Sequence, residues 1–412
     1  MNVATMRRVD RLLGIPAAAV MTLVRRFCPE VPVDTVPRCE KIVFIKLAEQ
    51  GSTVLATSAI RGAAELVGRP NVYFLVFEEN RFILETMELI PPENIIVIRN
   101  DTLASTIMGA VAAVRELWRR RIDTAIDLEF FARSSAVLTF LSWARHRVGF
   151  HAFGEGPYRG DLMTHRLVFN THIHTSQLFR MMVEALRMAP ASFPTFGVEP
   201  SSANEAAPVF KAGPAELAEV QSLLRDGVRD DEFGPLILLN ANCGDLLPLR
   251  RWPTDRYVEL AKRLLERYPT VRVALTGAPS EAEQVATVVG RIGSHRCYSL
   301  AGRTTLRQLL VVYCLAEVLV TNDSGPAHFS ALTPIDVITL FGPETPKLFA
   351  ARSARSHIFW EGIACSPCVN AFNGRTSACI NNLCMQQIDV DRVFEKTCQI
   401  YDQRIRLRQG ES

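Results

Sequence analysis

The 412-residue chain lacks any apolar run approaching the roughly 20 residues that a membrane-spanning helix needs. It also lacks a secretory signal with a small-residue cleavage site, so we expect a cytoplasmic protein whose isolated cysteines are reduced. Its formal charge is only +3, from 46 Lys and Arg against 43 Asp and Glu. Because nucleic-acid-binding proteins carry a concentrated positive excess, no nucleic-acid partner is expected. Any anionic ligand must be bound by a few local side chains.

Two common nucleotide-binding motifs are missing as well. No G-x-G-x-x-G follows an expected strand, which argues against nicotinamide or flavin binding. No G-x-x-x-x-G-K-[ST] is present, which excludes a P-loop nucleotidase. Hydrophobic residues nevertheless make up 48% of the chain, enough for large buried cores, and the length predicts two or three domains.

The chain alternates short β-branched runs with longer helix-period segments, the pattern of an α/β protein with parallel sheets. Strands are expected at 41–47, 71–77, 95–99 and 123–128, with helices at 53–66, 102–120 and 133–144. After a Pro-, Ser- and Ala-rich linker at 191–208, strands are expected at 236–240, 271–276, 297–300, 317–321 and 336–341, with helices at 254–267, 280–291, 304–314 and 325–332. Two Rossmann-like halves would bind ligands at the carboxyl ends of their strands.

The N-terminal segment, residues 1–37, is basic and amphipathic. An apolar run at 12–24 has arginines on both sides, at positions 7, 8, 11, 25 and 26. Such a segment either contacts an anionic membrane surface through residues 1–27, which would place the protein on the inner face of the cytoplasmic membrane, or docks on the protein itself. Pro16 should kink or restart the helix.

Four polar, glycine-containing loops follow expected strands of the second half, at 240–245, 276–281, 321–328 and 341–344. Each alone is compatible with an ordinary capped turn. Together they predict a nucleotide-type ligand, because helix starts and arginine forks suit a diphosphate. The candidate donor-binding residues are Asn242, Gly244, Arg250, Arg251, Gly277, Glu281, Asp323, Ser324, Gly325 and His328.

An ordered set of motifs resembles the bacterial heptosyltransferase-like glycosyltransferases of family 9. The motifs are R-R-W-P at 250–253, T-G-A-P-S-E at 276–281, L-A-G at 300–302, T-N-D-S-G-P-A-H at 321–328 and L-F-G-P at 340–343. The resemblance spans about residues 40–395. It implies a GT-B fold, in which two Rossmann-like domains face each other across a cleft.

By this resemblance, residues 38–190 bind the acceptor, residues 209–385 bind the nucleotide-sugar, and a C-terminal helix at 386–412 crosses back to the first domain. The implied reaction is an inverting, metal-independent transfer of a heptose or related sugar from a nucleoside diphosphate donor, typically ADP-linked. The implied acceptor is lipopolysaccharide or another surface glycan. The diphosphate would face Arg250 or Arg251 and the Asp323-Ser324-Gly325 turn, and the ribose would face Glu281.

The N-terminal motif departs from the family. The family pattern K-x-x-x-x-G-D has an aspartate as the base that deprotonates the acceptor, whereas this chain has Ser52 after Lys46 and Gly51. A serine hydroxyl is too weakly basic for this role, so Ser52 is expected to be a helix N-cap. Glu49, in the same loop, is the first candidate for the missing carboxylate. The alternatives are Asp127, Glu129 and Asp161.

Two further sets of residues are less specific. Lys46 could either stabilise the leaving phosphate or pair with Glu49. A basic, hydrogen-bonding wall for the acceptor is expected in the first half, although any single member could be an ordinary surface residue. Its candidate members are Gly51, Ser52, Arg133, Arg159, Asp161 and His165.

The last motif is a group of cysteines in the loop 364–385. Cys365, Cys368, Cys379 and Cys384 have the spacing C-x2-C-x10-C-x4-C. They could close a structural zinc site or bind another metal, or they could be disulfides or reduced thiols.

Because the family aspartate is missing, a noncatalytic nucleotide-sugar-binding or scaffold protein of the same fold is the alternative function.

Overall fold

The computed structural model describes residues 3–28, 32, 34–154, 156–192, 207–225, 234–244 and 247–409. Most of the expected linker at 191–208 lies outside these residues. The chain forms two compact units, and each is described by itself. Unit 1 comprises Met1–Pro208 together with Val369–Thr376, and unit 2 comprises Val209–Cys368 together with Ser377–Ser412. A short segment of the cysteine-rich loop therefore packs with the first unit instead of the second, where the sequence placed it.

Unit 1 is built on a parallel six-stranded sheet in the order β3-β2-β1-β4-β5-β6. Its strands are β1 (Ile42–Ile45), β2 (Val72–Phe77), β3 (Ile95–Ile98), β4 (Thr124–Asp127), β5 (His146–Phe150) and β6 (His165–Leu167). Strands β1 and β2 are apolar at every position because helices bury them on both faces. The strand order reverses between β1 and β4, so ligand-binding loops are expected at the carboxyl ends of these two strands.

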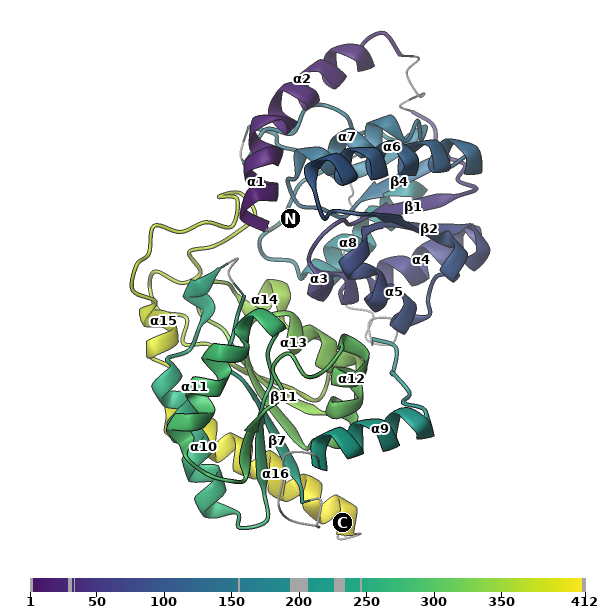
Figure 1. Cartoon of the computed structure of the whole chain (residues 1–412). Coiled ribbons are helices and arrows are strands. Elements are labelled where there is room, and N and C mark those ends of the chain that lie inside the picture. Colours follow the sequence, from purple (N-terminus) through teal and green to yellow (C-terminus); the bar gives the residue numbers. More distant parts are fainter. Residues whose placement is uncertain are drawn as a thin grey trace. The chain divides into compact units, whose positions relative to one another are not determined.

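Helices cover both faces of this sheet (Figure 1). Leu117 of α6 and Leu138 of α7 belong to the buried core of one face, and α4 packs against α8 in unit 1. The helices that follow β1 and the later strands are α3 (Gln50–Val54), α4 (Thr57–Val67), α5 (Arg81–Met87), α6 (Leu103–Arg120), α7 (Arg133–Leu141) and α8 (Thr175–Glu184).

Two N-terminal helices, α1 (Val3–Leu12) and α2 (Gly14–Arg25), pack against α7. Pro16 lies in the first turn of α2, where its missing N–H costs no intrahelical bond, so the helix restarts there as expected. The carboxylate of Asp10 accepts the backbone N–H groups of Arg133 and Ser134 at the start of α7. Among the described residues, no helix has the length and apolar content to cross a bilayer.

Unit 2 repeats the architecture with a parallel sheet in the order β12-β11-β10-β7-β8-β9. Its strands are β7 (Leu236–Asn240), β8 (Arg272–Leu275), β9 (Cys297–Ser299), β10 (Val318–Asn322), β11 (Asp336–Leu340) and β12 (Ser356–Phe359). Here the order reverses between β7 and β10, so the corresponding ligand-binding position lies at their carboxyl ends. The helices are α9 (Pro214–Arg225), α10 (Thr254–Arg267), α11 (Ala282–Ile292), α12 (Leu306–Leu315), α13 (Gly325–Phe329), α14 (Pro346–Phe349), α15 (Leu383–Gln386) and α16 (Val390–Gln409).

The C-terminal helix α16 packs on unit 2, which corrects the prediction that it crosses to the first domain. It contacts α10, β10 and β11, and its Ile400 and Tyr401 join the buried core of this unit. Arg404 fixes the helix, because its guanidinium bonds the buried carboxylate of Glu317 at 3.0 Å and the partly buried carboxylate of Asp336 at 2.8 Å. The segment that does belong to the first unit is Val369–Thr376.

Candidate active site

The loop after β1 is held by a buried carboxylate from the loop after β4. Glu129 accepts the backbone N–H groups of Leu47 and Ala48 through Oε1, at 2.9 and 3.1 Å. Its other oxygen lies 3.2 Å from Nζ of Lys46, a side chain with no exposed surface. Lys46 therefore has an ion-pair partner within unit 1. Both carboxylate oxygens of Glu129 already bind groups of this loop, so Glu129 is less suited than Glu49 to accept a proton from a substrate.

Glu49 lies beyond Lys46 in this loop, and its carboxylate is more accessible than those of Glu129 and Asp127. Its backbone is left-handed, with φ 67°, and its side chain is 26% exposed. Oε2 lies 3.9 Å from Nζ of Lys46 and 3.5 Å from Oγ of Ser52. Oε1 forms an ion pair with Arg375. The carboxylate is thus accessible and bracketed by two cations.

Ser52 is not the N-cap that the sequence predicted. It lies within α3, which begins at Gln50, and its hydroxyl donates to the backbone carbonyl of Glu49 at 2.9 Å. Gly51 is buried in the same short helix. Both residues therefore shape the loop that carries Glu49.

Asp127 is a structural carboxylate. It has no exposed surface, it pairs with Arg159, and it accepts a hydrogen bond of 2.9 Å from Ser135. Burial raises the pKa of Asp127 to about 6, against the opposing effect of Arg159. Because its oxygens are enclosed and already bonded, the structure does not favour Asp127 as the group that deprotonates an acceptor.

The expected acceptor wall is mostly internal. Arg159 is only 1% exposed and donates to the backbone carbonyls of Phe130 and Phe150 at 3.0 and 3.1 Å as well as to Asp127. His165 lies buried on β6, where burial lowers its pKa to about 4. The sequence could not separate these arginines and histidines from surface ones, because their charge suggested exposure.

Two further members of that wall, Arg133 and Asp161, hold the N-terminal helices. Arg133 donates to the carbonyl of Tyr158 at 2.8 Å and pairs with Asp10 at 3.3 Å. Asp161 pairs with Arg25 of α2 at 2.8 Å. Both residues thus hold N-terminal helices in this structure, and their contact with an acceptor stays a prediction.

In unit 2, asparagines join the carboxyl ends of β7, β8 and β10. Asn240 donates to Thr276 Oγ1 at 3.1 Å, and the amide of Asn322 donates to the carbonyl of Asn242 at 3.1 Å. Within the described residues, the buried Oδ1 of Asn242 has no hydrogen-bond partner. Hydrogen bonds thus fix these polar strand ends, and Oδ1 of Asn242 is available to accept a further hydrogen bond. This is the position where doubly wound sheets bind ligands.

Arg250 lies beside the end of β10 and is 8% exposed. Its guanidinium is 3.7 Å from Asp323 and 3.5 Å from Glu344, distances longer than a strong charged hydrogen bond. In the part of the chain that is described, the Nε groups of Arg250 and Arg251 donate no hydrogen bond. Both guanidiniums keep donor capacity, which suits the phosphates of a nucleotide.

The remaining donor candidates are arranged around the same strand ends. Oε2 of Glu281 accepts the N–H of Ala278 at 2.7 Å, so part of its carboxylate caps a helical turn. A Cβ at Gly277 would lie 2.8 Å from the amide of Asn242, which explains the glycine by packing. Ser324 donates to the carbonyl of Asn322 at 3.2 Å. Gly325 begins α13 and His328 is buried in it, while Gly244 is exposed with φ 65°.

Of the alternatives considered for the four cysteines, the structure shows free thiols and does not support the zinc site. No group of three or more His, Cys, Asp or Glu side chains among the described residues, which include all four cysteines, could hold a metal ion. Cys365 and Cys379 are exposed, Cys368 accepts a hydrogen bond from Ser377, and Cys384 is buried. Burial raises the pKa of Cys384 to about 11.

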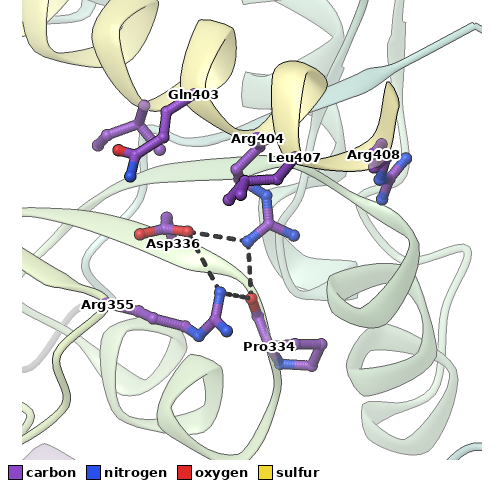
Figure 2. Close-up of a pocket in the computed structure, with 8 residues that line it drawn as sticks. Pro334, Asp336, Arg355, Gln403, Arg404, Leu407 and Arg408 are labelled. Atoms are coloured by element: carbon purple, nitrogen blue, oxygen red, sulfur yellow. Dashed lines mark hydrogen bonds and ion pairs between the residues drawn. The ribbon is translucent and has the colours of Figure 1, made fainter. Parts of the chain in front are cut away.

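A cavity of about 350 Å³ lies at the other end of the unit 2 sheet. Figure 2 shows Arg404 and Arg355 converging on Asp336, the first residue of β11, and on the carbonyl of Pro334. Because this cavity lies at the amino ends of the strands, it is remote from the loops described above. Its arginines have partners in the structure, and Arg404 and Arg408 fix α16 through Glu317 and Asp336.

Arg375 and Glu129 are site residues that the sequence reasoning did not assign as positioning groups. Arg375 lies 326 residues from its partner Glu49, in a loop whose Asn373-Gly374 pair signals only a turn. Nothing local links the two positions. For Glu129, its place two residues after Asp127 at the end of β4 was the available signal.

Comparison with known proteins places these features in a family context. The family model described as glycosyltransferase family 9 (heptosyltransferase) matches residues 111–376. Lipopolysaccharide heptosyltransferase 2 of Salmonella typhimurium is 32% identical over 115 residues, 27% of this chain and 32% of that protein. Lipooligosaccharide heptosyltransferase 2 of Haemophilus ducreyi is 28% identical over 236 residues, 55% of this chain and 63% of that protein. The matched parts thus span from one third to less than two thirds of these curated relatives.

Among solved structures, the ADP-heptose lipopolysaccharide heptosyltransferase II of E. coli superposes with a TM-score of 0.65 at 19% identity. The match covers 88% of this chain and 99% of that chain. At this level of identity the similarity concerns the fold. The expected α/β fold of the GT-B type, with two Rossmann-like domains, is confirmed.

Proposed function

Because the chain belongs to glycosyltransferase family 9, the heptosyltransferase family, we propose that it transfers a heptose or related sugar from a nucleoside diphosphate donor to a lipopolysaccharide or other surface-glycan acceptor. The names of the relatives support this acceptor, and the ADP-heptose enzyme of E. coli supports an ADP-linked donor. The transfer proceeds with inversion and without a metal. The observation that carries the proposal is the accessible Glu49 carboxylate at the position where unit 1 reverses its strand order.

In this reaction Glu49 acts as the general base. It takes the proton of the acceptor hydroxyl while that oxygen bonds to the anomeric carbon of the sugar, and the bond from this carbon to the diphosphate oxygen breaks. The electron pair leaves on the nucleoside diphosphate. Attack from the side opposite the leaving group inverts the anomeric centre. Lys46 helps to orient the base, because its ammonium group lies 3.9 Å from the carboxylate of Glu49 and 3.2 Å from that of Glu129.

Unit 2 holds the donor in this proposal. Arg250 and Arg251 bind the diphosphate with the donor capacity that the fold leaves them, and the turn at Asp323, Ser324 and Gly325 lies against it. Asn242 offers its buried oxygen to the nucleoside. Developing negative charge on the leaving diphosphate is stabilised by these guanidiniums, which supply the electrostatic part of catalysis.

The first experiment measures donor binding and transfer with the purified full-length protein. ADP and ADP-heptose should raise its melting temperature, since a ligand that binds only the folded state stabilises it. With a heptose-deficient lipopolysaccharide acceptor, ADP should be released and the acceptor should gain one sugar. Donor binding without transfer would instead favour the noncatalytic scaffold alternative. Absence of binding by ADP, UDP and GDP sugars would remove both.

We further propose that α2 rests on an anionic membrane surface, where a lipid-linked acceptor would be found. One face of α2 packs on unit 1 through Ala18, which has no exposed surface, and through the hydrogen bond of Thr22 with Asp161 at 3.0 Å. The other face is apolar and exposed. Its members, with Leu12, are Leu13, Val20, Leu23, Val24 and Phe27, of which Phe27 is 83% exposed. Exposed arginines border them at positions 8, 11 and 26.

Replacing Leu23 and Phe27 together by Glu should abolish co-sedimentation with vesicles that contain phosphatidylglycerol, because apolar burial and charge attraction are both lost. Wild-type protein should bind these vesicles, and should bind pure phosphatidylcholine vesicles less. Ile380→Glu is the matched control, since Ile380 is 99% exposed but lies in unit 2. Equal vesicle binding by the double variant and wild type would overturn the membrane proposal.

A further inference from the structure

The segment Val369–Thr376, which we call the strap, leaves the end of the unit 2 fold and packs with unit 1. Its anchor is Phe372, whose ring lies against the rings of Phe131 and Phe169, with centroids 5.5 Å apart in both pairs. Val369 and Ala371 of the strap are also buried, at 2% and 5% exposure. An aromatic anchor in an aromatic pocket fixes the strap on the unit that carries Glu49.

Hydrogen bonds within the strap give it one conformation. The backbone N–H groups of Asn370 and Asn373 each donate to the side-chain oxygen of the other, at 3.1 and 3.0 Å. The N–H of Arg375 donates to the carbonyl of Asn370 at 2.9 Å. This closed turn places Arg375 at the end of the strap, on a backbone that is already ordered.

Arg375 meets the candidate base directly. Its Nη1 forms an ion pair with Oε1 of Glu49, and the two side chains are 15% and 26% exposed. The other carboxylate oxygen of Glu49 faces Lys46 of the β1 loop, with Glu129 of the β4 loop behind that lysine. Cations from two elements thus hold one carboxylate from two sides.

Backbone geometry singles out the same two residues. In the described part of the chain, five residues other than glycine have a positive φ, and Glu49 and Arg375 are two of them, with φ 67° and 56°. Strained backbone of this kind persists where surrounding contacts enforce it, and it gathers at functional sites. Here both partners of one ion pair are strained.

We propose that Arg375 is a positioning residue for the transfer reaction: it orients the carboxylate of Glu49 toward the acceptor hydroxyl and keeps it ionised. This inference rests on the proposed function. A guanidinium beside a carboxylate favours its charged form, which is the form that accepts a proton. The planar guanidinium also fixes the direction of the carboxylate more firmly than a flexible ammonium would.

The test is the pH profile of sugar transfer by Arg375→Gln, Arg375→Lys and wild type, measured from pH 5 to 9. In R375Q, loss of the positive charge favours the protonated form of Glu49. The fall of kcat/KM on the acidic side of the pH profile, which we call the acidic limb, should therefore move to higher pH. We expect kcat at pH 7 to fall about tenfold or more while the KM for the donor stays unchanged. R375K should restore the acidic limb, because it restores the charge.

Two further variants make the outcome specific. Phe372→Ala removes the anchor and should shift the acidic limb in the same direction as R375Q, although it leaves both charges in the chain. Arg392→Gln is the matched control, since Arg392 pairs with Glu361 in unit 2, and it should leave the profile unchanged. Thermal unfolding of each variant reports whether the fold is intact.

The inference is overturned if folded R375Q transfers sugar with the kcat and the acidic limb of wild type. Equal loss of activity in R375Q at every pH, with no movement of the limb and no rescue by R375K, would also overturn it, because that pattern indicates a general structural role. If wild type itself transfers no sugar, the proposed function fails, and the inference that rests on it fails too. The two failures are thus distinguished by the wild-type assay.

Discussion

Changing Glu49 to Gln is expected to lower the rate of sugar transfer by about 10²–10⁴-fold, the contribution of a positioned general base. The amide has nearly the same size and shape but cannot accept the proton of the acceptor hydroxyl. Since Glu49 belongs to unit 1 and the donor residues belong to unit 2, the affinity for ADP should not change. The expected signature is therefore a loss of kcat with intact donor binding.

Steady-state transfer kinetics and calorimetric titration with ADP measure these two quantities. Glu85→Gln is a matched control, because Glu85 lies in the same unit and pairs only on the surface with Arg81. It should retain wild-type kinetics. Full activity of E49Q would eliminate Glu49 as the base and would reopen the question of which group replaces the family aspartate.

Changing Arg159 to Met should cost about 3–5 kcal/mol of the free energy of unfolding, the usual result of removing one partner from a buried ion pair. The variant leaves the carboxylate of Asp127 buried without its cation. It also removes the donor for the carbonyls of Phe130 and Phe150.

Urea unfolding of the full-length protein, monitored by circular dichroism and fluorescence, measures this loss. The double variant Asp127→Asn with Arg159→Met should recover part of the stability, since no charge is then left buried. Arg119→Met is the control, because the Arg119 pair with Glu116 is on the surface and should contribute little. A stability of R159M close to that of wild type would contradict a structural role for this pair.

The parallel strands were predictable because each is a short apolar run with a helical segment after it. Every strand expected from the sequence is present within a few residues, including β1, β2 and β10. The strands that the sequence did not indicate are β5, β6 and β12. Their sequences HRVGF, HRL and SHIF mix polar and apolar residues. Strands β6 and β12 also lie at sheet edges, where each has a neighbouring strand on one side only.

The candidate site was predictable only where it follows local rules. Glu49, Arg250 and Asp323 follow strand ends, and strand ends of parallel sheets are where ligands bind. The internal roles of Arg159 and His165 were not predictable, because a charge pattern does not reveal which partner a distant segment supplies. The same holds for Arg375, whose partner precedes it by most of the chain.

The strap also bears on the order in which the protein folds during synthesis. Unit 1 contains Met1–Pro208 and Val369–Thr376, so its last piece is made only after the greater part of unit 2. At about 5–20 residues per second, roughly ten to thirty seconds separate these two pieces on the ribosome. During that interval Phe131 and Phe169 have no Phe372 to cover them. A nascent chain would therefore leave these two rings uncovered until the strap is synthesised, and α15 and α16 of unit 2 would follow only after that.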